Sequence, residues 1–400
     1  MRQIDLLIVE DEDKNYRLYE QTIKAFNRET GVTIKPERAK DLVEAEKLLV
    51  HHNYDAAIVD IILKTGGTED NADGVDILRK IVGKLRFPVF VYSGNPGLIN
   101  GEEFEQNYFF KIHARDGIEF IELLKEIVKI FQTGITNVLG GKGKVESYLA
   151  SLFWNHLIHT MDYWQDNSAL REEKDYEKIL LRYTIFHLVE TLYRTDTGEH
   201  EIHDPSEFYI YPAINDNLFT GDIIEIETEK YIVLTPACDM VLHKNHKRKD
   251  ENDPLMVRNA SNFIAAKLIK WNRLKDEKND FNEISSASSS IIRGEFKKHI
   301  KNTVNRYHFL PPYLSFDGYF IDFQDLHSFS IKEKPVYRIL ASVASSFMKD
   351  ITARFSYYYS RQGQPDMDME AIGKKLLDEQ SKILKAKDLK KDSDGTAATE

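Results

Sequence analysis

The chain has 400 residues, of which 42% are hydrophobic, and a net charge of −11, so it has room for two or three domains with real cores. Its one cysteine, Cys238, excludes an intramolecular disulfide framework, and no apolar run approaches the roughly 18 residues of a membrane helix. We therefore expect a soluble cytoplasmic protein. We also expect that it does not bind DNA, because neither part of the chain is basic: residues 1–132 hold 18 Lys+Arg against 24 Asp+Glu, and the remainder holds 36 against 41.

Short β-branched runs alternate with amphipathic helical patterns through the first third of the chain. The predicted strands cover residues 4–10, 56–62, 87–92 and 108–111. Apolar residues at three-four spacing predict helices over residues 14–28, 40–51, 74–85 and 117–131. This alternation implies right-handed crossovers, and it predicts a doubly wound α/β fold with a parallel sheet.

Polar side chains stand at the carboxyl end of each predicted strand. In chain order they are Glu10 with Asp11, then Asp60, Ser93 and Lys111. In an open parallel sheet these ends meet at one edge, where ligands bind. Carboxylates are natural ligands of Mg²⁺, and a lysine can neutralise charge on phosphoryl oxygens. The sequence therefore favours phosphorylation of an aspartate at this edge.

These segments resemble the receiver domain of bacterial response regulators over about residues 1–132. The resemblance implies that Asp60 is the phosphoryl acceptor and that Glu10 and Asp11 form the acidic pair that holds Mg²⁺. It also implies that Ser93 contacts a phosphate oxygen and that Lys111 pairs with the phosphoryl group. Catalysis would extend only to autophosphorylation and autodephosphorylation of the receiver.

Two further residues take roles from the same resemblance. The backbone carbonyl of Ile62 would be another metal ligand, and Tyr108 would be the aromatic residue that changes rotamer on activation. The segment between Asp60 and Gly74 is several residues longer than most receivers have, and Ile112 replaces the proline that commonly follows the lysine. We expect these departures to affect the speed of phosphorylation and the shape of the partner surface more than the chemistry.

The remaining chain is expected to be helical first and β-rich afterwards. A glycine-rich stretch at 140–144 reads as a hinge, and two long helices are predicted at 145–164 and 173–194. Further on we expect a hairpin at 221–226 and 231–236, a flexible loop at 284–290, a strand at 319–323 and a helix at 335–358. From about Lys385 the charged composition predicts disorder. The predicted domains are a receiver at 1–132, a helical connector at 133–200, an α+β, β-rich output or interaction domain at 201–360, and a helix with a charged tail at 361–400.

Thr235, Cys238 and Asp239 belong to the most unusual local string of the second half. With Gly221-Asp222-Ile223 before it, the string is weakly similar to the small barrels of MazF-type toxin ribonucleases, in which Thr235 would be the hydroxyl residue. No arginine lies at a convincing position for such a nuclease. The alternative is a β-barrel used for protein contacts, with Cys238 as a small buried hydrophobe.

These features indicate a response regulator that receives its phosphoryl group from a sensor histidine kinase and whose output is not DNA binding. Its domain order is similar to that of the receiver proteins of Detocs-type antiphage two-component systems. That similarity implies a phosphate sink that keeps a second response regulator unphosphorylated until infection. The alternatives are a phosphorylation-gated effector enzyme in the second half and a phosphorylation-dependent adaptor. The oligomeric state cannot be predicted from the sequence.

Overall fold

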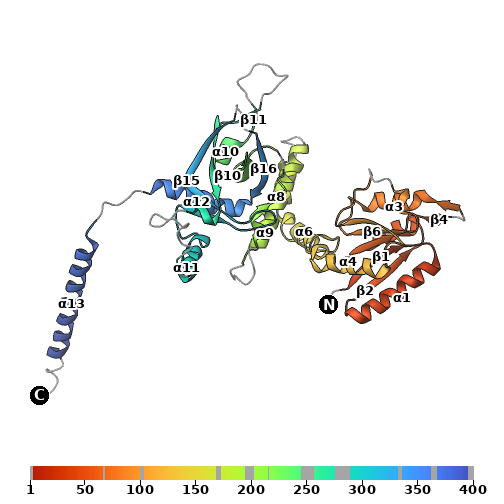
Figure 1. Ribbon diagram of the computed structural model, residues 1–400, viewed down its shortest axis with the longest axis horizontal. Helices are drawn as coiled ribbons and strands as arrows, with labels where there is room; N and C mark the ends of the chain where they lie inside the picture. Colours follow the sequence, from red (N-terminus) through yellow and green to blue (C-terminus); the bar gives the residue numbers. More distant parts are fainter. Residues whose placement is uncertain are drawn as a thin grey trace. The chain divides into compact units, whose positions relative to one another are not determined.

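The computed structural model of the protein divides into two compact units, Met1–Glu199 and His200–Glu400 (Figure 1). The structure describes residues 3–65, 68–99, 103–167, 173–193, 202–214, 216–244, 256–274, 289–331, 336–361 and 367–394. None of the described helices is long and apolar enough to span a membrane.

A five-stranded parallel sheet forms the centre of the first unit. Its strand order is β2-β1-β3-β6-β7, the 2-1-3-4-5 order of flavodoxin-like and CheY-like folds. The strands are β1 (Ile4–Val9), β2 (Ile34–Ala39), β3 (Ala56–Val59), β6 (Val89–Ser93) and β7 (Phe110–Ala114). The helices that connect or follow them are α1 (Asp13–Thr30), α2 (Leu42–His51), α3 (Asn71–Ile81) and α4 (Phe120–Gln132). The predicted receiver fold is therefore confirmed.

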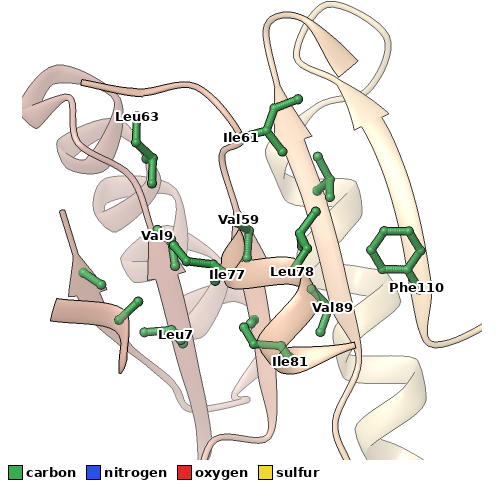
Figure 2. Close-up of a cluster of buried hydrophobic side chains, with 14 of the residues drawn as sticks. Leu7, Val9, Val59, Ile61, Leu63, Ile77, Leu78, Ile81, Val89 and Phe110 are labelled. Atoms are coloured by element: carbon green, nitrogen blue, oxygen red, sulfur yellow. The ribbon is translucent and has the colours of Figure 1, made fainter. Parts of the chain in front are cut away.

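Both faces of this sheet are covered by helices, so the three central strands β1, β3 and β6 are buried along nearly their whole length, whereas the edge strands β2 and β7 are only partly buried. On one face, β1, β3 and β6 pack against α2 and α3, with Val9, Val59 and Ile77 among the buried residues (Figure 2). On the other face α1 and α4 contribute buried residues such as Ile23 and Leu124. The two layers fix the strand ends, and hence the edge where the polar residues lie.

Two connections of this unit differ from the predicted pattern. Within the segment after Asp60, β4 (Leu63–Thr65) pairs antiparallel with β5 (Thr68–Asp70), where a loop without strands was expected. Between β6 and β7 the described residues contain only a 3₁₀ helix, η1 (Pro96–Leu98), because the glycine and proline content there disfavours an α-helix. Strand β2 was not predicted, since its sequence Ile-Lys-Pro-Glu-Arg-Ala has few apolar residues.

Four helices and a 3₁₀ helix complete the part of the first unit that the structure describes. They are α5 (Ile135–Leu139), α6 (Lys144–Asn155), η2 (Leu157–Thr160), α7 (Met161–Asn167) and α8 (Glu173–Tyr193). The helix predicted at 145–164 is therefore broken after Asn155, whereas the one at 173–194 is confirmed. The stretch at 140–144 is anchored rather than hinge-like, because Lys142 pairs with Asp5 and lies 3.4 Å from Asp55. Both acids precede or open strands, so this contact lies at the sheet edge opposite to Asp60.

A mostly antiparallel seven-stranded sheet forms the second unit, with the order β14-β15-β13-β10-β9-β16-β8. Its strands are β8 (Tyr209–Ile210), β9 (Asp222–Ile226), β10 (Glu229–Val233), β13 (Asn262–Ile269), β14 (Tyr307–Leu310), β15 (Tyr319–Ser330) and β16 (Tyr337–Val343). A separate pair is β11 (His243–Lys244) with β12 (Met256–Val257). Among the described residues the other elements are α9 (Pro205–Phe208), α10 (Ala237–Met240), η4 (Trp271–Arg273), α11 (Ser289–Ile300), α12 (Ser345–Ser360) and α13 (Met369–Asp394).

The predicted β9–β10 hairpin and the strand at 319–323 are confirmed, but two other predictions for this unit are wrong. Residues 337–343, expected to be helical, form strand β16, which pairs with β9. Their apolar residues at 337, 339, 341 and 343 recur at every second position, as in a strand. Helix α13 continues through Lys385 to Asp394, where disorder was expected. The loop predicted at 284–290 falls largely outside the described residues, and α11 begins at Ser289.

Candidate functional site

Three carboxylates gather at the carboxyl edge of the parallel sheet in the first unit. Glu10 and Asp11 follow β1, and Asp60 follows the neighbouring strand β3. One ligand atom from each lies within 4.8 Å of the others. Glu10 and Asp60 are buried, with 1% and 6% of their surfaces exposed. The acidic cluster of Glu10, Asp11 and Asp60 that was expected from the sequence is therefore present.

Hydrogen bonds fix the orientation of Glu10. Its Oε1 atom accepts from the backbone N–H of Glu12 and from Asn15 Nδ2, both at 3.1 Å. Arg38 on β2 holds the turn that follows, because its guanidinium donates to the backbone carbonyls of Glu10 and Asp11 at 2.8 Å. The second oxygen, Oε2, faces a neighbouring arginine side chain. Burial raises the pKa of Glu10 despite these bonds.

Hydrogen bonds hold the backbone and the carboxylate of Asp60. Its backbone N–H donates to Val9 O at 2.9 Å. Its Oδ1 accepts from the N–H of Ile62 at 3.3 Å, which stabilises the charged carboxylate. The fully buried hydroxyl of Ser93, at the end of β6, also hydrogen-bonds to its carboxylate. Burial still raises the pKa of Asp60, although Ser93 and a nearby arginine act in the opposite direction.

That arginine is Arg115, which the sequence analysis did not identify. Its Nη2 atom donates to Glu10 Oε2 at 2.5 Å and to Asp60 Oδ2 at 2.6 Å. It follows β7 directly, and its backbone N–H donates to Ser93 O at 3.0 Å. The turn Asp116-Gly117 was the available signal, because Asp-Gly pairs mark chain reversals and so the end of the preceding strand.

The structure does not bring Lys111 to the acidic cluster. The register of β7 on β6 pairs Lys111 with Phe90 and Ala114 with Ser93, so Lys111 lies three residues before the strand end. Its Nζ atom forms an ion pair with Glu126 of α4 at 2.9 Å. The predicted strand at 108–111 was placed too early, which put the lysine at the wrong end of the strand. Tyr108 precedes β7 and is 83% exposed.

A close backbone approach shapes the connection after Asp60. A Cβ atom added to Gly74 of α3 would lie 2.4 Å from Ile61 Cα, a distance that real side chains do not tolerate. Only glycine therefore lets α3 pack this tightly against the segment that carries Asp60 and Ile62. Next to Ser93, a Cβ added to Gly94 would meet no heavy atom within 4 Å, so space is open there.

The donor set fits Mg²⁺ by its chemistry. Carboxylate oxygens of Glu10, Asp11 and Asp60 are hard ligands, and they are close enough together to share one ion. A backbone carbonyl such as that of Ile62 is a ligand of the same type. Because Arg115 carries only one positive charge against three carboxylates, the cluster keeps a net negative charge that favours a divalent cation.

The residues singled out in the second half have structural roles or lie on the surface. Thr235 is buried, and its Oγ1 accepts a 2.7 Å hydrogen bond from the N–H of Ile264. Cys238 is exposed, contrary to the expectation of a buried thiol, and Asp239 is partly exposed on α10. A cavity of about 910 Å³ lies beside this segment, lined by β-strand residues including Asp222 and by α12.

Comparisons with solved structures match receiver domains to the first third of the chain. The response regulator receiver domain of PhyR from Erythrobacter litoralis is 17% identical, with a TM-score of 0.25, over 32% of this chain and 90% of that one. A CheY-like receiver domain from Methylobacillus flagellatus is also 17% identical, with a TM-score of 0.25, over 32% and 99%.

A third similar structure is the receiver domain of a sensor histidine kinase from Pseudomonas aeruginosa, which has a magnesium ion coordinated in its active-site cleft. It is 18% identical, with a TM-score of 0.25, over 32% of this chain and 97% of that one. No family model and no curated protein matches the chain. The fold assignment for residues 1–132 rests on the strand order and on the helices that cover the two sheet faces.

Proposed function

We propose that this protein is a response regulator and that Asp60 accepts a phosphoryl group from a sensor histidine kinase in the cytoplasm. The observation that supports this proposal is the acidic cluster itself, with the Ser93 hydroxyl on the Asp60 carboxylate. A purely structural site has no evident need for three carboxylates at one sheet edge, two of them buried. Such an arrangement costs stability unless a cation compensates it.

Each residue of the cluster has a defined part in the proposed reaction. Glu10, Asp11, Asp60 and the carbonyl of Ile62 would hold Mg²⁺, which when bound screens the repulsion between the aspartate and an anionic donor. An Asp60 oxygen forms a bond to phosphorus while the bond from phosphorus to the histidine nitrogen of the donor breaks. The nitrogen leaves with the electron pair and is protonated. Ser93 donates to a phosphoryl oxygen, and Gly94 leaves room for the group.

The role of Tyr108 as a switch remains part of the proposal. Its ring is 83% exposed, and it lies at the start of the segment leading into β7. An exposed aromatic side chain can change rotamer at little cost, and it can be covered when a partner binds. Tyr108→Ala would then change partner binding without changing the yield of phosphorylated Asp60.

The test of phosphoryl acceptance uses a small donor and the full chain. Incubation with phosphoramidate and Mg²⁺ should add one phosphoryl mass to the wild-type protein, as measured by intact mass spectrometry. Asp60→Asn should take up none. Asp76→Asn is the matched control, because Asp76 is a surface residue of α3 paired with Arg79. Equal labelling of wild type and Asp60→Asn would refute the assignment.

We further propose that phosphorylation serves as a sink in antiphage defence, keeping a second response regulator unphosphorylated until infection. An acceptor site with its carboxylates in place supports storage of a phosphoryl group. Expression of Asp60→Asn together with the kinase and the second regulator should then harm the cells, whereas wild type protects them. Healthy cells with the variant would exclude the sink.

We also propose that domain boundaries lie near residues 132, 200 and 360.

The effector-enzyme alternative has one supporting observation, the cavity of about 910 Å³ beside α10. In that case phosphorylation would switch on degradation of RNA by the second unit. Cys238 and Asp239 are the candidates to test first because both are accessible, so Cys238→Ser and Asp239→Asn should leave the fold intact. No RNA cleavage by the phosphorylated wild-type protein would exclude this function.

A further inference from the structure

Arg115, which was not expected at this site, supplies the positive charge next to the acidic cluster. Arg115 Nη2 bridges Glu10 Oε2 and Asp60 Oδ2, at 2.5 and 2.6 Å, so its charge lies between two of the three carboxylates proposed to hold Mg²⁺. A guanidinium in this position makes charge-assisted hydrogen bonds with both partners. It therefore satisfies one oxygen of each of two carboxylates that would hold a divalent ion.

We infer that Arg115 acts both as a competitor of the metal ion and as the phosphoryl-binding cation of the site. Before phosphorylation its guanidinium neutralises part of the charge of Glu10 and Asp60. Metal binding displaces it from Glu10, and it then pairs with the phosphoryl oxygens once Asp60 is modified. This inference rests on the proposed function of Asp60, and it adds the residue that sets metal affinity and stabilises the product.

Charge and geometry both support the role of Arg115 as the phosphoryl-binding cation. Three carboxylates and one guanidinium leave a charge of −2, which a divalent ion cancels, but a phosphoryl group adds negative charge again. The planar guanidinium is suited to two oxygens of a phosphoryl group. Arg115 is also anchored next to the acceptor, because its N–H bonds to Ser93 O at 3.0 Å. The Ser93 hydroxyl and the guanidinium thus contact the same Asp60 carboxylate.

The side chain of Arg115 has the freedom that this exchange needs. It is 26% exposed, and its Nε atom makes only a long contact of 3.4 Å with Tyr92 O. Rotation about its side-chain torsions can move the guanidinium while the backbone stays in place. Lys111, by contrast, is committed to Glu126 at 2.9 Å on the α4 side of the sheet.

Substitutions at Arg115 and Lys111 decide which of the two side chains is the phosphoryl-binding cation. Magnesium affinity is measured by calorimetry, and the rate of phosphorylation by intact mass with phosphoramidate as donor. Removing a unit charge a few ångströms from the metal should tighten Mg²⁺ binding by about tenfold in Arg115→Ala. Losing the cation that faces the phosphoryl oxygens should slow phosphorylation by about 100-fold. Arg115→Lys should recover most of the rate.

The opposite signs of these two effects distinguish the inference from a structural role, which would weaken both metal binding and phosphorylation. Lys111→Ala and the matched control Arg79→Ala, whose side chain pairs with Glu103, should behave like wild type in both assays. Circular dichroism verifies that each variant is folded.

Unchanged magnesium affinity and rate in Arg115→Ala would overturn the inference, as would loss of the rate in Lys111→Ala alone. If wild type binds Mg²⁺ but takes no phosphoryl group, the proposed function fails and the phosphoryl-binding role of Arg115 fails with it. The magnesium affinities of wild type and Arg115→Ala still decide whether the guanidinium competes with the metal.

Discussion

Replacing Asp60 with asparagine should stabilise the first unit when no divalent cation is present. Asp60 lies within 4.8 Å of two other carboxylates. At an effective dielectric of about 20, each such pair costs about 3.5 kcal/mol, and the Arg115 contact returns about 6 kcal/mol. About 1 kcal/mol of repulsion remains, and the desolvation of a buried carboxylate adds to it. We expect Asp60→Asn to gain about 1–2 kcal/mol.

The pH dependence follows from the same burial. Because the folded protein raises the pKa of Asp60 above its ordinary value of 3.8, it binds more protons than the unfolded chain between the two pKa values. The stability contributed by this group is therefore lost as pH rises through the folded pKa. Asp60→Asn should remove that part of the pH dependence, so its advantage over wild type should be greatest at neutral pH.

Amide hydrogen exchange read by mass spectrometry is the appropriate assay, because it reports the opening free energy of β1 and β3 separately from the second unit. Mg²⁺ at ten times its dissociation constant should stabilise wild type by about 1.4 kcal/mol and Asp60→Asn by less. Asp76→Asn is the control. Lower protection of Asp60→Asn without Mg²⁺ would refute the reasoning, since the carboxylate would then be a net stabilising partner of Arg115.

Three further predictions concern packing and titration. Gly74→Ala should lower the stability of the first unit by about 2–3 kcal/mol, because the added methyl group forces α3 away from the backbone of Ile61. Gly97→Ala, whose added Cβ would meet only an ordinary 3.7 Å contact, should be nearly neutral in the same exchange assay. Thr235→Ala should destabilise the second unit by about 1 kcal/mol because the N–H of Ile264 loses the hydroxyl oxygen that accepts its hydrogen bond. Thr235→Ser should restore stability, and equal stability of the two variants in urea unfolding would contradict this. Burial lowers the pKa of His308 from 6.5 to about 4. The free energy of unfolding of the second unit should therefore fall by about 3 kcal/mol as the pH falls from 6.5 to 4. Thermal unfolding at each pH measures this loss, and His308→Gln should abolish it.

Much of the parallel α/β fold of the first unit could be predicted because its signals are local and strong. Buried parallel strands require continuous apolar runs, and amphipathic helices require three-four spacing, so β1, β3, β6 and the helices around them were visible in the sequence. The carboxylates at Glu10, Asp11 and Asp60 follow strands that adjoin in the sheet, and strand adjacency alone brings them together.

The errors arose where pairing register, rather than composition, decides the structure. The run Tyr108–Lys111 is more apolar than His113–Ala114, which moved the predicted strand toward the amino terminus and hid Arg115. In the sheet, pairing with β6 extends β7 to Ala114, opposite Ser93. The helix predicted at 335–358 also covered β16, whose residues 337–343 pair with β9. Register depends on contacts distant in sequence, which local patterns do not contain.

Locating the phosphoryl group on the chain tests the central claim most directly. The full-length protein is incubated with Mg²⁺ and a small phosphoryl donor, the acyl phosphate is reduced with borohydride, and the peptides are sequenced by mass spectrometry. We expect the reduced residue, homoserine, at position 60 and its loss in Asp60→Asn. A folded, Mg²⁺-binding protein without modification at Asp60, or modified elsewhere, would contradict the account.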